Sequence, residues 1–144
     1  MTHSLTQFER YLAPTGRILM GLFFVFAGIG KIGDIGGTAA YIASAGLPMP
    51  AVLALLALII EIAGGILLIT GFYGRYTALL LALFVLVVTF PFHGPGTWTD
   101  NPIQQIMFMK NMAIMGALIF MAAHIGKAAI SPQKQTSTSP IPTL

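Results

Sequence analysis

Cysteine is absent from this chain of 144 residues, and only 8% of the residues are charged. Without thiols the chain has no disulfide exchange, no thiolate metal site and no iron–sulfur ligation, so a redox role would need a cofactor that is bound in another way. No nucleophile stands beside a base, and no group of His, Asp and Glu has the spacing of a metal site. We therefore expect no metal, no intrinsic cofactor, and a non-catalytic protein rather than a stand-alone enzyme.

Apolar residues are abundant: they make up 56% of the chain, and the mean hydropathy is +0.87. Soluble domains average about 25% charged residues, and a water-soluble fold of this length would not bury so much apolar surface. The apolar residues fall into four runs, each close to the roughly 20 residues with which a helix crosses a bilayer core. None of the runs alternates in polarity as the strands of a membrane barrel do. We predict an all-α fold, a four-transmembrane-helix bundle with spans at about residues 15–32, 51–70, 75–92 and 106–125.

Basic residues mark one side of the membrane, because Lys and Arg are retained on the cytoplasmic side. They lie before the first span, between the second and third spans, and after the fourth, as Arg10, Arg17, Arg75, Lys127 and Lys134. We therefore expect both termini to be cytoplasmic, with an N-terminal cytoplasmic segment at residues 1–14, a membrane domain at 15–130 and a disordered cytoplasmic tail at 131–144. The first span has no cleavage pattern, so we expect it to be retained. The pI of about 9.5 reflects this topology and contact with anionic lipid headgroups, since no basic stripe typical of nucleic-acid binding is present.

Glu61 is the one ionisable residue in the apolar run from Ala51 to Ile69. A carboxyl group inside a membrane span is unfavourable unless it is paired, protonated or shielded, so it is the first candidate for a functional residue. Its helical face carries Ala and Gly residues, which are typical of the faces at which membrane helices meet. Glu61 should therefore point into the bundle, where Lys31 or Lys110 reaches it from the outer end of the first or fourth span.

Three interpretations of this carboxyl group remain open. The first is an ionic staple that fixes the register of the helices and binds nothing. The second is a site that binds a ligand or handles a proton. In the third, Glu61 stays protonated and donates a hydrogen bond to the backbone.

The loop after the third span places His93 and Trp98 within a segment rich in Pro and Gly, residues 91–98. One interpretation is a structural cap in which Trp98 anchors the loop at the level of the headgroups. The other is a lid over a cavity at Glu61. His124 ends the fourth span at the opposite membrane surface, too far from His93 to share a haem iron, and there it complements the dipole at a helix C-terminus.

Three segments carry a family resemblance: RILMGLFFVFAGIGK from Arg17 to Lys31, EIAGGILLITG from Glu61 to Gly71 followed by Arg75, and FMKNMAIMG from Phe108 to Gly116. With these segments the chain resembles the DoxX family of small four-helix inner-membrane proteins over residues 15–127. The resemblance implies a multi-pass protein of the bacterial cytoplasmic (inner) membrane. It also implies a link to redox chemistry, because some relatives are subunits of thiosulfate:quinone oxidoreductases or of redox-stress membrane complexes.

The resemblance and the polar residues together predict an accessory subunit of a quinone-linked or redox-stress membrane oxidoreductase complex. In this interpretation Glu61 is the candidate catalytic residue, a quinone is the expected bound molecule, and the ligand-binding candidates are Lys31, Glu61, Lys110, Asn111, His93 and Trp98. A small proton-coupled transporter and a non-catalytic membrane scaffold are the alternatives. The expected partners are the lipid bilayer, oxidoreductase proteins and, through the glycine-rich faces, a second copy in a homo-oligomer, but no nucleic acid.

Overall fold

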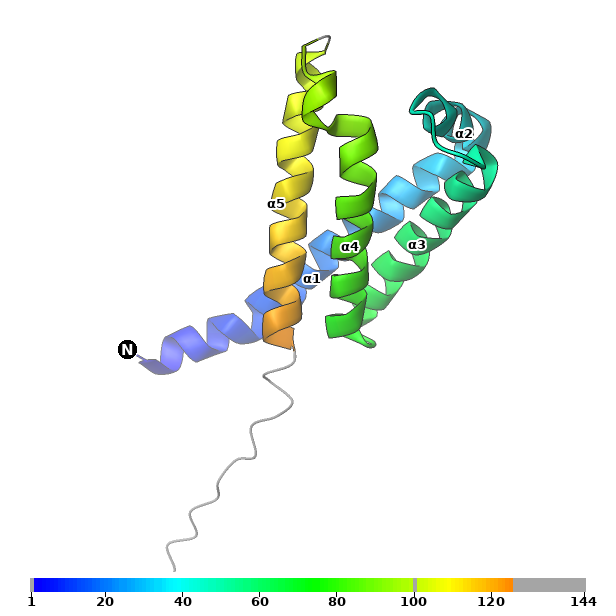
Figure 1. Ribbon diagram of the computed structural model, residues 1–144. Coiled ribbons are helices and arrows are strands. Elements are labelled where there is room, and N and C mark those ends of the chain that lie inside the picture. Colours follow the sequence, from blue (N-terminus) through cyan, green and yellow to red (C-terminus); the bar gives the residue numbers. More distant parts are fainter. Residues whose placement is uncertain (1, 100, 126–144) are drawn as a thin grey trace, which may run out of the picture.

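The computed structural model describes residues 2–99 and 101–125, with side chains from Tyr11 onward in these ranges. The described residues form helices and no strands (Figure 1). In chain order these are α1 (Thr2–Gly33), α2 (Ile35–Ser44), α3 (Pro50–Thr70), α4 (Gly74–His93), the short 3₁₀ helix η1 (Pro95–Thr97) and α5 (Pro102–Ile125). The predicted tail at residues 131–144 lies outside the described residues.

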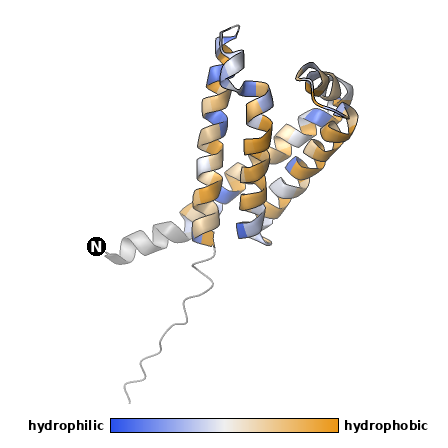
Figure 2. Ribbon diagram, in the orientation of Figure 1, coloured by the Kyte–Doolittle hydropathy of each residue, from blue (hydrophilic) through white to orange (hydrophobic). Residues whose placement is uncertain are grey.

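Within the part of the chain that the structure describes, four helices are long and apolar enough to cross a membrane, which confirms the predicted all-α fold with four spans. Their bounds are Tyr11–Gly33, Pro50–Thr70, Gly74–Thr97 and Pro102–Ile125. Apolar residues dominate α3 and α4, whereas polar residues gather near the helix ends (Figure 2). The fourth span begins earlier than predicted, because Asn101 caps α5: its side-chain oxygen accepts a hydrogen bond of 3.0 Å from the backbone N–H of Ile103.

The chain is also helical outside the predicted limits of the first and second spans. Helix α1 continues through Pro14 without a break, so residues 2–14 belong to the same helix as the first span. The outer connection contains α2, which starts where the Asp34 side chain accepts a hydrogen bond of 2.7 Å from the backbone N–H of Gly37. Helix α3 ends at Gly71, whose left-handed backbone conformation (φ 78°) suits glycine. These caps define short connections, so neighbouring helices fold back on one another.

The spans are arranged as two pairs (Figure 1). Helix α1 packs along α3, α4 packs along α5, and the pairs meet where α3 contacts α4. Within the described residues, α1 and α5 do not pack along their length. The bundle is therefore open on the side between its first and last helices.

Glycines set the close approach of α1 and α3. A Cβ atom at Gly21 would lie 2.7 Å from the carbonyl oxygen of Gly65, and a Cβ atom at Gly65 would lie 2.7 Å from that of Gly21. Neither position has room for a side chain, so the two backbones pack directly on each other. At the adjacent position of α3, the missing side chain of Gly64 makes room for Leu81 of α4. The small-residue faces thus lie where the sequence analysis expected helices to meet.

The predicted cytoplasmic location of both termini can be tested with single cysteines, since the natural chain has none. We expect Phe72→Cys, in the exposed turn between α3 and α4, to react with a membrane-impermeant maleimide only after cells are permeabilised. Gly96→Cys, in the exposed connection between α4 and α5, should react in intact spheroplasts. The unmodified chain is the blank, and the reverse labelling pattern would mean that the topology is inverted.

Candidate functional site

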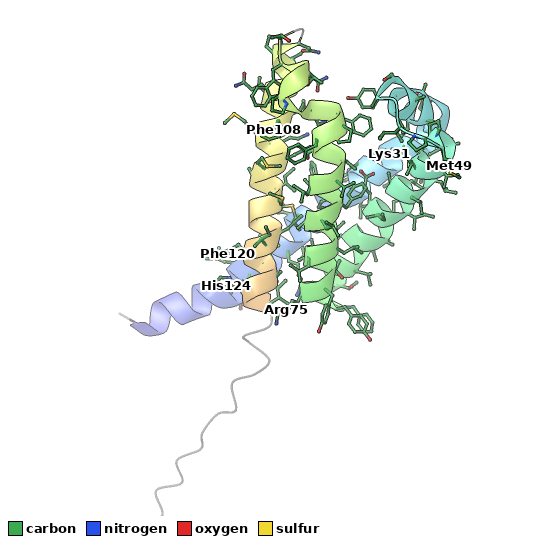
Figure 3. The ribbon with its side chains drawn as sticks, in the orientation of Figure 1. Lys31, Met49, Arg75, Phe108, Phe120 and His124 are labelled. Carbon is green, nitrogen blue, oxygen red and sulfur yellow. The ribbon has the colours of Figure 1, made fainter. Side chains whose placement is uncertain are left out.

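Lys31 and Glu61 form an ion pair between α1 and α3. The Lys31 ammonium group donates a hydrogen bond of 2.9 Å to Oε1 of Glu61 and lies 2.7 Å from Oε2. It also donates to the backbone carbonyl oxygen of Ala27 at 3.3 Å. Of the two contacts that the sequence predicts for Glu61, the one with Lys31 is therefore formed. Figure 3 shows Lys31 where the outer part of α1 runs beside α3.

The packing of α1 on α3 explains why this lysine reaches the carboxylate. A Cβ atom at Gly28 would lie 3.4 Å from Cβ of Glu61, so the two backbones are close at that level. Lys31 follows Gly28 by three residues and lies on the same face of α1, about one turn nearer the outer end. Its stem extends along the helix and places the ammonium group on the carboxylate.

Glu61 lies near the middle of α3, one of the helices long enough to cross a membrane. The rise of a helix places Glu61 about 16 Å from Pro50 and about 14 Å from Thr70 along α3, and a bilayer core is about 30 Å thick. Glu61 is 7% exposed, while the Lys31 side chain keeps 24% of its surface exposed. Oε2 of Glu61 is buried and receives no hydrogen bond of good geometry from the described residues. The Glu61 carboxylate is therefore more enclosed than the Lys31 side chain, which is partly exposed.

The alternative contact of Glu61 with Lys110 is not formed. Lys110 is exposed on α5, where its ammonium group lies 3.4 Å from the sulfur of Met107 and 6.0 Å from the centroid of the Phe23 ring. Helix α5 packs against α4 and not along α3, so Lys110 does not face Glu61. Its location beside an aromatic ring of α1 places it at the open side of the bundle.

Asn111 joins α5 to α4 rather than contributing to the ion pair. Its side-chain NH₂ group donates a hydrogen bond of 3.0 Å to Oγ1 of Thr89, which is completely buried. The Thr89 hydroxyl in turn donates to the backbone carbonyl oxygen of Val85. The sequence analysis did not identify Thr89, although a hydroxyl group in an otherwise apolar span is a signal of interhelical hydrogen bonding.

His93 and Trp98 close the end of the α4–α5 pair that contains η1. The Trp98 indole N–H donates a hydrogen bond of 3.0 Å to the backbone carbonyl oxygen of His93, and the Trp98 ring lies 5.4 Å from that of Phe108. Nδ1 of His93 is hydrogen-bonded to the side-chain oxygen of Gln104. These contacts match a structural cap over α4 and α5, and they involve neither Lys31 nor Glu61.

The family comparison places the first three spans in a known class. The DoxX family profile matches residues 12–94, which include both members of the ion pair. The chain belongs to the DoxX family.

Two relatives from Escherichia coli (strain K12) are described as inner membrane proteins. The chain is 37% identical to inner membrane protein YqjF over 109 residues, which cover 74% of this chain and 78% of that protein. It is 34% identical to inner membrane protein YphA over 117 residues, which cover 80% of this chain and 83% of that protein. No solved structure matches the chain. The fold and these relatives together identify a multi-pass protein of the inner membrane.

Proposed function

We propose that this protein is a membrane-embedded accessory subunit of a quinone-linked oxidoreductase complex, in which the Lys31–Glu61 pair delivers a proton to a quinone oxygen. The observation that carries the proposal is an ion pair halfway along the membrane-spanning helix α3, in which the Lys31 side chain remains partly exposed. Ionisable groups at such depth typically mark ligand or proton sites. The quinone is an expectation from the family resemblance described in the sequence analysis.

In the proposed reduction of the quinone, the electrons and the protons come from different proteins of the complex. Reduction of a quinone to a quinol takes up two electrons and two protons. The electrons come from a redox subunit of the complex, because this chain has no cysteine with which to hold a cluster or exchange disulfides. For one of the protons, the Lys31 ammonium group donates to the reduced quinone oxygen and becomes a neutral amine. The Glu61 carboxylate then favours reprotonation of that amine by water from the outer end of α1.

The partial exposure of Lys31 fits a proton donor better than a transport site. The Lys31 side chain is 24% exposed against 9% for that of Glu61, and its ammonium group lies within 3.3 Å of three oxygens: Oε1 and Oε2 of Glu61 and the carbonyl oxygen of Ala27. The two cavities on the open side of the bundle, between α1 and α5, have neither Lys31 nor Glu61 in their lining. These features favour a proton donor for a membrane-soluble molecule over a carrier that moves solutes past Glu61.

The substitution Glu61→Gln tests the proposal. Glutamine keeps the size of the side chain and an acceptor oxygen for Lys31. It lacks the negative charge that favours reprotonation of the Lys31 amine. We expect quinone-linked turnover of the complex, isolated from its native membrane, to fall by at least about tenfold, the effect of losing general acid–base assistance. The measurement is the rate of quinol formation, followed spectroscopically with a short-chain quinone.

Lys110→Gln is the matched control, because it removes a lysine from a span without touching the pair. It should leave turnover unchanged. The amount of complex recovered with each variant separates the proposal from a purely structural role. If Glu61→Gln prevents assembly, or if it assembles and retains full turnover, the pair is an ionic staple and the proposal is wrong.

A further inference from the structure

A groove runs along the open side of the bundle between α1 and α5. It consists of two adjoining cavities of about 350 and 370 Å³. Gly16 and Met121 line both cavities, so the two are continuous. Apolar side chains dominate the walls, among them Leu12, Leu19, Phe23, Ile114 and Phe120.

The groove has the length of a single acyl chain. On α5 its lining extends from Ile114 to Ile125, which corresponds to about 16 Å at the rise of a helix. Half of a bilayer core is about 15 Å thick. The groove therefore reaches from one membrane surface to about the middle of the bilayer, at the end of the bundle that contains the α3–α4 turn.

Arg17 provides a cationic group at the surface end of the groove, where it lines the first cavity. Its guanidinium group lies against Gly71, since a Cβ atom there would be 2.5 Å from Nη1 of Arg17. Nε of Arg17 is buried and has no hydrogen-bond partner among the described residues. A guanidinium group with unused donors beside a membrane surface matches the geometry of a phosphate group.

His124 lies at the same end and lines the same cavity. Its Nδ1 donates to the backbone carbonyl oxygen of Phe120 at 2.8 Å, because a carbonyl oxygen only accepts, and this leaves Nε2 for another partner. Figure 3 shows Phe120 and His124 on the stretch of α5 near α1, with Arg75 at the same end of the bundle. Among the side chains that the structure describes, from Tyr11 onward, the lining of the groove contains no acidic residue. Its surface end is therefore electropositive, and its deeper part is apolar.

We propose that the groove binds one anionic phospholipid from the leaflet at that end, with an acyl chain between α1 and α5 and the phosphate group on Arg17. His124 provides a second contact to the headgroup. Among the described residues that line the groove, the one charged side chain, Arg17, lies at the end assigned to the headgroups, which fits an anionic lipid. Basic pockets between membrane helices are typical sites for anionic lipids.

The experiment uses the full chain, purified in mild detergent and transferred to nanodiscs of phosphatidylcholine with or without phosphatidylglycerol. Native mass spectrometry counts the lipids that remain bound after release from the nanodisc. We expect one phosphatidylglycerol molecule to be retained in preference to phosphatidylcholine. Arg17→Gln should lower this retention about tenfold, as expected for the loss of a charge-assisted hydrogen bond.

Two further variants separate the groove from general surface charge. Gly16→Leu should lower retention of either lipid, since a Cβ atom at Gly16 has only the end of Met121 within 4 Å and a larger side chain would fill the cavity. This variant keeps the test valid even if Arg17→Gln folds poorly. Arg75→Gln removes an exposed charge that is not part of the groove, and it should retain lipid like the natural chain.

Several outcomes would overturn the proposal. Equal retention of the two lipids would show that Arg17 does not select the headgroup. An equal loss in Arg17→Gln and Arg75→Gln would assign the effect to surface charge. Displacement of phosphatidylglycerol by excess inorganic phosphate would indicate a site for free phosphate, and a protein recovered in place of lipid would indicate a docking surface for a partner helix.

Discussion

Lys31→Met should destabilise the protein by about 3 kcal/mol, because breaking one half of a buried ion pair leaves the other charge without a partner. The value is at the lower end of the usual range, since the Lys31 side chain keeps 24% of its surface exposed while Glu61 is 7% exposed. In the variant, the Glu61 carboxylate must either stay charged without its partner or take up a proton. Thermal unfolding in detergent, followed by far-ultraviolet circular dichroism, measures the loss.

The double variant Lys31→Met/Glu61→Leu should recover most of that loss, because two apolar side chains of similar volume often replace a buried pair with little change in stability. Glu61→Leu alone should resemble Lys31→Met. A double variant that is as unstable as the sum of the two single variants would mean that the residues act independently, and that the ion pair does not hold α1 on α3.

Gly65→Ala should have a second large effect, at least about 2 kcal/mol of lost stability from overpacking. The added methyl group would lie 2.7 Å from the carbonyl oxygen of Gly21 and 2.9 Å from the backbone nitrogen of Val25. Both are backbone atoms, so they cannot move aside without separating the helices. The same thermal unfolding measurement detects the effect.

Gly30→Ala is the matched control on α1, since a Cβ atom at Gly30 meets nothing within 4 Å. It should be neutral or slightly stabilising, because alanine favours a helix more than glycine does. If Gly65→Ala unfolded at the same temperature as Gly30→Ala, the close crossing of α1 and α3 would not be what holds the first pair of spans together.

The number of spans and the direction of Glu61 could be predicted from the sequence, because both depend on local patterns. Runs of apolar residues define the spans, and the small residues around Glu61 define the face that meets another helix. The choice between Lys31 and Lys110 could not be predicted in the same way. The choice depends on which helices are neighbours, and the pattern of small residues on one helix does not indicate which helix packs against it.

Two other features needed the tertiary structure as well. Thr89 becomes recognisable only when Asn111 of α5 is placed beside it. The groove at Arg17 arises because α1 and α5 diverge, and no motif in either helix predicts that divergence. From the sequence, Arg17 could be used only to predict the orientation of the protein in the membrane. Its role in the groove depends on residues of other helices that lie near it in space.

Trp98 is the single tryptophan of the chain, and it lies between His93 and Phe108 at the outer cap of α4 and α5. Intrinsic tryptophan fluorescence therefore reports on the α4–α5 pair and not on the α1–α3 pair. The two pairs meet mainly where α3 contacts α4. An optical signal from the indole follows the later half of the membrane domain, whereas circular dichroism averages over every helix, so the two read-outs together reveal whether the halves melt as one cooperative unit.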